Sequence, residues 1–261
     1  MSFRLPFSGR LGLKLMASGA VLLLLLAAAT AWLIGRGFEQ TRANALVRAR
    51  AGLEAQARAS LAQLASSEAR LTWANLEQAA TVSRVGARSL GKLLEEQQGR
   101  VVPRHRLARL PGGQRYDPNP ERASEVFIPS FVTPGSALDA DTAASDLLDP
   151  LLPALYAQVD DAVAVYFVGL SGATRYHPVR DIHEMVPADL DIRKQEQFRN
   201  AVPSRNPGLA TVWTSPYLDD AGTGLLITAA TPVLIGTEFR GIVAVDVSLN
   251  RLAARLEQIQ P

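Results

Sequence analysis

An uncharged apolar run near the N-terminus constrains this chain more than any other feature. No residue is charged from Leu15 to Gly35, and leucine and alanine fill the centre of the run. A helix of about 21 residues, at 1.5 Å per residue, is long enough to cross a hydrocarbon core of about 30 Å. Trp32 lies near the end of the run, where interfacial aromatic residues are typical. The run therefore predicts a transmembrane helix.

A cleaved signal peptide is the competing interpretation of this run, because Ala29-Thr30-Ala31 resembles a small-residue cleavage site. The run continues through Ile34 and exceeds the usual h-region of about 7–15 residues, which favours an uncleaved anchor. Arginine residues precede and follow the run, so the positive-inside rule does not orient it.

Composition narrows the classes of function. The 261 residues include no cysteine, which excludes disulfides and thiolate metal sites. The net charge is only +2 and no basic block is present, so we expect no nucleic-acid partner.

Residues 36–98 predict one long helix. They contain no proline and are rich in good helix formers. Apolar residues recur at helical spacing, namely Leu46, Leu53, Leu61, Leu64, Leu71, Val82, Val85 and Leu93. A helix with one apolar stripe must pack on the following domain, on a partner copy, or on both. A plain coiled-coil stalk is the alternative, although the heptad is irregular. We expect Gly52, Gly86 and Gly91 to weaken the helix by up to ~1 kcal/mol each.

Residues 99–150 are rich in proline and predict an irregular segment, called the excursion. Half of the sixteen prolines lie between Pro103 and Pro153. Four aspartates cluster loosely there, but the fixed alternation of oxygen ligands that a calcium loop needs is absent. The cluster therefore favours a solvated acidic loop.

The remaining chain predicts helices interleaved with five antiparallel strands. Short turns separate the strands, whereas a parallel crossover needs a dozen or more residues. The expected helices are 147–159 and 191–202, and the expected strands are 163–170, 174–179, 211–218, 225–235 and 239–247.

Three motifs in the second half of the chain carry a family resemblance. They are Trp213-Thr-x-Pro216-Tyr217-x-Asp219, a Gly224-Leu-Leu-Ile-Thr-Ala-Ala-x-Pro-Val strand, and Gly241-Ile-Val-Ala-Val-Asp246-Val-Ser-Leu. Together they resemble a Cache domain over about residues 150–252. Cache domains are the extracytoplasmic, PAS-like sensor modules of bacterial chemoreceptors, histidine kinases and diguanylate cyclases.

The resemblance implies an α+β fold, in which a transmembrane helix and a long helix precede a PAS-like five-stranded antiparallel sheet flanked by helices. It also implies a cytoplasmic N-terminus. The expected organisation is a basic N-terminus at 1–14, a transmembrane helix at 15–35, a long stalk helix at 36–98, the excursion at 99–150, the sensor module at 151–252, and the start of a connecting helix at 253–261.

Amino-acid-sensing Cache domains imply a ligand site in this chain. Their helix motif is matched by Asp191, Arg193 and Phe198, while Tyr217-x-Asp219 and Asp246 match two later motifs in which acids hold the ligand ammonium. The candidate ligand-binding residues are Arg193, Phe198, Trp213, Tyr217, Asp219 and Asp246. Turn capping is the alternative role for Tyr217 and Asp219, a hydrogen-bonded strand-end acid for Asp246, and core packing for Phe198 and Trp213.

Two departures from that family bear on the ligand. Gln195 and Gln197 stand where the family has its carboxylate-binding arginine and a tryptophan. A glutamine lacks the charged, fork-shaped donor of arginine. An ordinary α-amino acid is therefore a doubtful ligand on sequence grounds. An amine, another cationic or neutral solute, or no small ligand at all remains open.

Catalytic and metal sites find little support in the sequence. His177, Asp181, His183 and Glu184 are near one another, but Pro178 interrupts them and the two histidines are six apart, which favours a polar loop. No nucleophile–base set or phosphate loop is recognisable. We expect no enzyme, no cofactor and no metal; an extracytoplasmic hydrolase is the least favoured hypothesis.

The sequence predicts the ligand-sensing input module of a bacterial signal-transduction receptor, with a chemotaxis, histidine-kinase or related output. The expected location is the inner membrane, with a periplasmic sensor and a homodimer formed through the long helix. A second span and an output domain are not recognisable before Pro261. The alternative is a membrane-anchored dimerisation module without a small-molecule ligand.

Overall fold

The structure is a computed structural model that describes residues 10–97 and 107–257. Most of the predicted basic N-terminus, His105 and the end of the chain lie outside the described residues. The chain divides into two compact units, Met1–Ser66 and Ser67–Pro261, which are described separately below.

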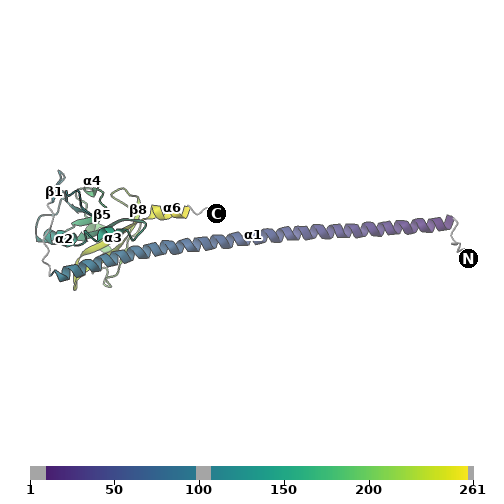
Figure 1. The fold of residues 1–261 in the computed structure, drawn as a ribbon, viewed down its shortest axis with the longest axis horizontal. Coiled ribbons are helices and arrows are strands. Elements are labelled where there is room, and N and C mark those ends of the chain that lie inside the picture. Colours follow the sequence, from purple (N-terminus) through teal and green to yellow (C-terminus); the bar gives the residue numbers. More distant parts are fainter. Residues whose placement is uncertain (1–9, 98–106, 258–261) are drawn as a thin grey trace. The chain divides into compact units, whose positions relative to one another are not determined.

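A single helix, α1, runs from Arg10 to Glu96 and contributes to both units (Figure 1). In the first unit its large apolar side chains are exposed, both in the apolar run and at later positions such as Leu46 and Leu53. Among the described residues, α1 is the helix long and apolar enough to cross a membrane. The exposed apolar run is therefore consistent with the predicted anchor.

The second unit is built on an antiparallel sheet that holds nine strands within the described residues. Its order is β1-β2-β3-β5-β4-β9-β8-β6, and β7 pairs with β8. The strands are β1 Ala108–Arg109, β2 Arg115–Tyr116, β3 Glu125–Ile128, β4 Ala162–Gly169, β5 Thr174–His177, β6 Val212–Trp213, β7 Tyr217–Leu218, β8 Leu225–Ile235 and β9 Glu238–Ser248.

The predicted fold class is confirmed, but the predicted count of five strands is wrong. The proline-rich segment expected to be irregular contributes β1, β2 and β3. All four residues of β3 are buried, and β3 pairs with β2 and β5. The strand expected at 211–218 is divided into β6 and β7. Pro216 lies between them, and proline has no N–H to donate to the ladder of β8.

The expected helices are also shorter than their sequence patterns. The helix expected at 147–159 contracts to α3, Leu152–Tyr156, and the one at 191–202 divides into the 3-10 turn η1, Ile192–Lys194, and α5, Glu196–Ala201. The remaining helices are α2 Ser136–Asp146, α4 Ile182–Met185 and α6 Leu249–Glu257. These short segments depend on the sheet for stability, because isolated helices of this length are unstable in water.

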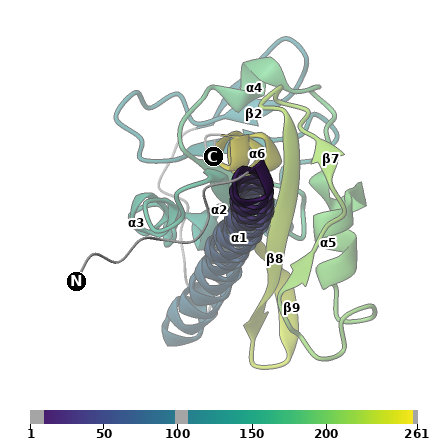
Figure 2. The ribbon, with the colours of Figure 1, turned by 90° about the vertical axis from the view of Figure 1, so that its right-hand side faces the viewer.

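The sheet has two covered faces, and strand alternation assigns each residue to one of them. On β9, Val243, Val245 and Val247 join the core under α1 and α3, whereas Ile242 and Ala244 join the core under α5. Figure 2 shows α1 and α3 on one side of β8 and β9, and α5 on the other. The two faces are called the α1 face and the α5 face below.

Small residues let the second part of α1 approach the sheet closely. The Ser83 hydroxyl donates to Val243 O and lies 2.8 Å from Thr231 Oγ1. A Cβ at Gly91 would lie 2.5 Å from Leu234 O, so only glycine fits there. Gly91 was expected only to weaken the helix, but its role is to admit the β8 backbone.

Candidate functional site

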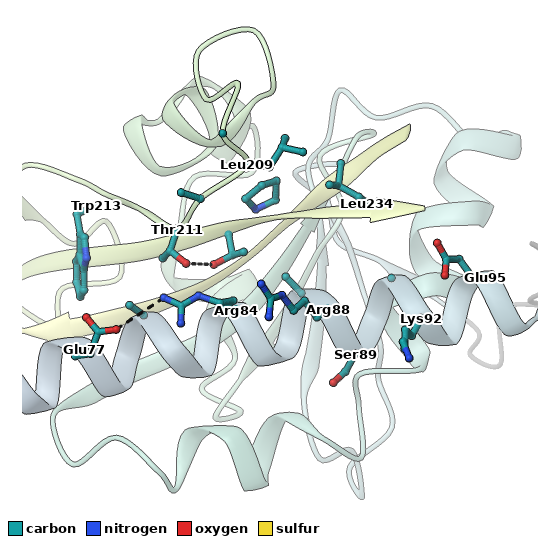
Figure 3. A pocket seen from close by; sticks show the side chains of 17 residues that line it. Glu77, Arg84, Arg88, Ser89, Lys92, Glu95, Leu209, Thr211, Trp213 and Leu234 are labelled. Atoms are coloured by element: carbon teal, nitrogen blue, oxygen red, sulfur yellow. Dashed lines mark hydrogen bonds and ion pairs between the residues drawn. The ribbon is translucent and has the colours of Figure 1, made fainter. Parts of the chain in front are cut away.

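Among the described residues, one large hollow lies on the α1 face, between α1 and strands β6 and β8. This groove has a volume of about 870 Å³. Figure 3 shows Arg84, Arg88 and Lys92 along α1 and Trp213 across from them. Glu77 lies 3.8 Å from Arg84, and both side chains are substantially exposed. The groove therefore offers open, mixed charges and contains no buried carboxylate that could select a ligand.

The smaller hollow lies on the α5 face and contains the buried acid Asp246. Its volume is about 50 Å³. Its walls come from the sheet, from α5 and the segment before it, and from the turn that follows β7. The residues with polar side chains that line it are Tyr166, Tyr176, Gln195, Gln197, Tyr217, Asp219, Asp220 and Asp246.

Three hydroxyl groups converge on one oxygen of Asp246. The Thr228 hydroxyl donates to Asp246 Oδ1 at 2.6 Å, the Tyr166 hydroxyl at 3.0 Å, and the Tyr217 hydroxyl at 3.3 Å. Burial raises the pKa of the Asp246 carboxyl from 3.8 to about 7, and the three hydrogen bonds oppose this rise. No positively charged group is among the causes of the shift. The carboxyl is therefore oriented and poorly solvated, and a cationic partner would favour its charged form.

The two tyrosines beside Asp246 belong to different elements. Tyr166 is on β4 and Tyr217 is on β7, and burial raises the pKa of both hydroxyls well above the usual range. Both therefore act as neutral donors at ordinary pH. Tyr166 also stacks on Tyr176 with ring centroids 5.7 Å apart, which fixes the position of its hydroxyl.

Asp219 both lines the cavity and holds its own turn. Its Oδ1 accepts from Ala221 N at 3.2 Å, and its Oδ2 accepts from the backbone and the hydroxyl of Thr223. These contacts correspond to the turn-capping alternative. Asp219 therefore adds negative potential beside Asp246 from a position that the turn fixes.

Gln195 and Gln197 form one edge of the cavity. Gln197 Nε2 donates to Gln195 Oε1 at 2.7 Å, and Gln195 Nε2 donates to Asp220 Oδ2 at 2.8 Å. The second contact joins the segment before α5 to the turn after β7. We call the Gln195–Asp220 pair the latch.

The structure does not bring the other predicted site residues to this cavity. Arg193 pairs with both oxygens of Asp191 and donates to Leu170 O at 2.8 Å. Phe198 is buried in the α5-face core, edge-on to Phe239 at 5.8 Å. Trp213 lies on the opposite, α1 face and lines the larger groove. Of the six candidates, Tyr217, Asp219 and Asp246 lie together.

Sequence reasoning missed Tyr166, Tyr176, Thr228 and Asp220. Strand alternation offered a signal for Thr228, because it pairs with Asp246 in the β8–β9 ladder. No comparable signal existed for Tyr166, which reads as an ordinary residue of a buried strand.

Comparisons with known proteins agree with this architecture. Residues 162–254 match the family model described as methyl-accepting chemotaxis protein-like, first PDC sensor domain. This match fits the Cache-type (PDC) sensor region of the chemoreceptor kind that the sequence motifs predicted. A search of curated proteins found no significant match.

Three solved ligand-binding domains similar to this chain come from two Pseudomonas species. The PctB domain of P. aeruginosa with L-Gln is 27% identical, covers 41% of this chain and 39% of its own, and has a TM-score of 0.32. The CtaA domain of P. fluorescens with L-isoleucine is 25% identical, covers 45% of this chain and 44% of its own, and has a TM-score of 0.35. The PctC domain of P. aeruginosa with GABA is 23% identical, covers 44% of this chain and 50% of its own, and has a TM-score of 0.34. This chain thus spans half or less of each.

These structures correct one expectation about the ligand. The departures at Gln195 and Gln197 led us to expect that an ordinary amino acid is a doubtful ligand, and that expectation is wrong. Similar domains bind L-Gln, L-isoleucine and GABA.

Proposed function

We propose that the cavity beside Asp246 binds the ammonium group of a small molecule, amino acids included. The observation that carries this proposal is the buried Asp246 carboxyl, which accepts three hydroxyl hydrogen bonds and has no positively charged partner among the causes of its pKa shift. A charge-assisted hydrogen bond from an ammonium would relieve the cost of burying that carboxylate.

The neighbours of Asp246 support a cation in preference to a second anion. Asp219 and Asp220 both line the cavity, and Asp219 raises the Asp246 pKa further by repulsion. The aromatic rings of Tyr166, Tyr176 and Phe127 form its apolar wall. This combination of apolar walls and a few convergent polar groups is typical of small-molecule sites.

A ligand carboxylate would meet neutral donors in this site. Gln195 and Gln197 line the cavity on the α5 side, where their amide groups can donate hydrogen bonds. A neutral amide binds a carboxylate less strongly than a bidentate guanidinium does. We infer that the ammonium end provides most of the affinity and that the other end of the ligand varies.

Ligand binding requires the cavity to open. Its volume of about 50 Å³ is far below the ~300 Å³ at the lower end of typical ligand pockets. The latch between Gln195 and Asp220 is an exposed hydrogen bond, so its rupture costs only about 0.5–1.5 kcal/mol. We infer that the turn after β7 moves away from α5 when a ligand enters.

At the level of the whole chain, we infer a non-enzymatic input module that passes a binding signal to the membrane. The sensor region and the apolar helix support an anchored receptor, with the sensor on the periplasmic side of the inner membrane. Dimerisation through α1 is supported by the exposed apolar side chains at Leu46, Leu53 and Leu61.

The test is isothermal titration of the full chain, in detergent micelles at pH 8, against the L-amino acids and a series of primary amines. We expect at least one ammonium compound to bind, and Asp246→Asn to weaken it by about 100-fold, since removal of one member of a buried charge pair costs 2–5 kcal/mol. Thr231→Val, on the α1 face of the neighbouring strand β8, is the matched control. If no compound binds, the dimerisation module without a ligand is the correct account.

A further inference from the structure

We propose that Glu125, Asp181 and His183 form a binding site for a divalent transition metal, with Zn²⁺ as the best fit. The three side chains each offer one ligand atom, and these atoms lie within 4.8 Å of one another. Glu125 comes from β3, whereas Asp181 and His183 lie at the start of α4. The site is distinct from the Asp246 cavity and does not depend on its function.

The strongest indication is the state of the His183 side chain. His183 is only 4% exposed, and its Nδ1 has no hydrogen-bond partner among the described residues. A buried polar atom without a partner costs about 1–3 kcal/mol. Nδ1 faces Glu125 Oε2 at 3.7 Å, which is too long for a hydrogen bond. Two ligands of one tetrahedral zinc ion, each about 2.0–2.1 Å from the metal, are separated by about 3.3 Å.

The surroundings hold two of the three ligands in place. The His183 ring stacks on Tyr116 with centroids 4.0 Å apart and an interplanar angle of 8°. The Glu125 carboxylate is 1% exposed and accepts from Arg180 N at 2.8 Å and from Ile182 N at 3.0 Å. Both groups are therefore preorganised, and little conformational entropy is lost when a metal binds.

Asp181 completes the set from the solvent side. Its side chain is 58% exposed, so the site is accessible, and a small movement can bring a carboxylate oxygen to the metal. Asp181 Oδ1 accepts from Arg122 Nη2 at 2.6 Å, and a carboxylate has a second oxygen available for a metal. Ligating carboxylates are commonly hydrogen-bonded in this way, which orients them.

The ligand chemistry selects the metal class. The imidazole nitrogen favours zinc and similar transition metals, and carboxylates also bind zinc, whereas calcium prefers six to eight oxygen ligands. Three protein ligands leave a position for water. The sequence analysis considered Asp181 and His183 but favoured a polar loop and no metal. It missed Glu125, which lies more than fifty residues before this group and reaches it only through the pairing of β3 with β5.

The test uses the full chain without a histidine tag, stripped of metal with a chelator and titrated with Zn²⁺ alone. The chain lacks cysteine and has three histidines, so background binding is low. We expect one Zn²⁺ per chain and a higher thermal midpoint in its presence, because a ligand of the folded state stabilises it. We expect His183→Gln to abolish both effects.

Two conservative variants form a matched pair. Asp181→Asn keeps a residue that tolerates the backbone φ of 55° at this position, and we expect it to weaken Zn²⁺ at least about tenfold, since even outer-shell losses cost 10–100-fold. Asp189→Asn removes an exposed carboxylate from the same segment and should change nothing. Absence of Zn²⁺ binding by the parent chain would overturn the proposal. Equal Zn²⁺ affinity of the parent chain and Asp181→Asn would also overturn it and leave only adventitious binding. The Asp181→Asn comparison provides the test if His183→Gln does not fold.

Discussion

The two faces of the sheet share strands β8 and β9 but bury different chemistry. On the α1 face, valines pack against a helix whose small residues allow contact with the strand backbone, and the buried polar contact there joins two hydroxyls, Ser83 and Thr231. On the α5 face, the same strands present Thr228 and Asp246 to a small cavity. A neutral polar pair costs little to bury, whereas a carboxyl costs much more.

The two faces therefore contribute differently to the free energy of unfolding. The α1 face is packed for rigidity, and a change there should appear in the free energy of unfolding. The α5 face retains a poorly solvated acid that lowers stability at neutral pH, and this pattern is typical of a functional site. Substitutions on the α5 face should therefore alter ligand binding, whereas substitutions on the α1 face should alter stability alone.

Asp246→Asn should make the unliganded chain more stable at pH 8, although it weakens ligand binding. The folded-state pKa of about 7 lies above the ordinary 3.8, so the stability that Asp246 contributes is fully present below about pH 4 and is lost as the pH rises through about 7. Asparagine mimics the protonated form and removes this loss, which is on the order of 4 kcal/mol. Urea unfolding of both chains from pH 4 to pH 8 measures the difference, and an asparagine variant that is less stable at pH 8 would show that Asp246 is structural.

Gly91→Ala and Gly52→Ala should have opposite effects. At Gly91 the added methyl group meets Leu234 O, and overpacking of this kind costs about 1–3 kcal/mol. At Gly52 nothing lies within 4 Å of the added group, so the helix gains up to about 1 kcal/mol. Thermal unfolding compares the two. Equal midpoints for both variants would contradict the close contact of α1 with β8.

Thr228→Val and Thr231→Val provide the same substitution on each face. Thr228 donates to Asp246, so its loss should raise the Asp246 pKa further and weaken an ammonium ligand about tenfold at pH 7. Thr231 contacts Ser83 and Thr211, so its loss should lower stability by about 1 kcal/mol and leave the affinity unchanged. Calorimetric affinities and unfolding free energies of both variants check this assignment, which fails if Thr231→Val weakens binding as much as Thr228→Val does.

Asp220→Ala should change rates more than affinity. Without the latch, the turn after β7 opens more easily, and both association and dissociation should accelerate a few-fold, as expected for one exposed hydrogen bond of about 1 kcal/mol. Stopped-flow kinetics with the best-binding ammonium compound measure both rates. Unchanged rates would show that the ligand enters by another route.

The sequence predicted elements with strong periodicity and missed those that depend on tertiary pairing. The long helix and the β8–β9 hairpin follow from composition, spacing and the turn at Gly236. The two-residue strands β1 and β2 carry no periodicity of their own and form because β3 offers a paired edge.

The candidate site was predictable only in part, for a similar reason. Asp246 and Tyr217 were found through their motifs, and the structure brings them to one cavity. Arg193 satisfied the same kind of motif, but the neighbouring Asp191 captures its guanidinium, so the side chain is engaged outside the cavity. A motif specifies residue types, whereas local ion pairs decide where a long side chain points.

The most direct measurement of the central claim is the titration of the Asp246 carboxyl carbon by NMR, in the full chain with ¹³C-labelled aspartate. Asp246→Asn assigns the signal. Without ligand we expect a pKa of about 7, and with the best-binding ammonium compound a clearly lower value, because a bound cation favours the carboxylate. A compound that binds while the titration of Asp246 stays unchanged would contradict the proposed site.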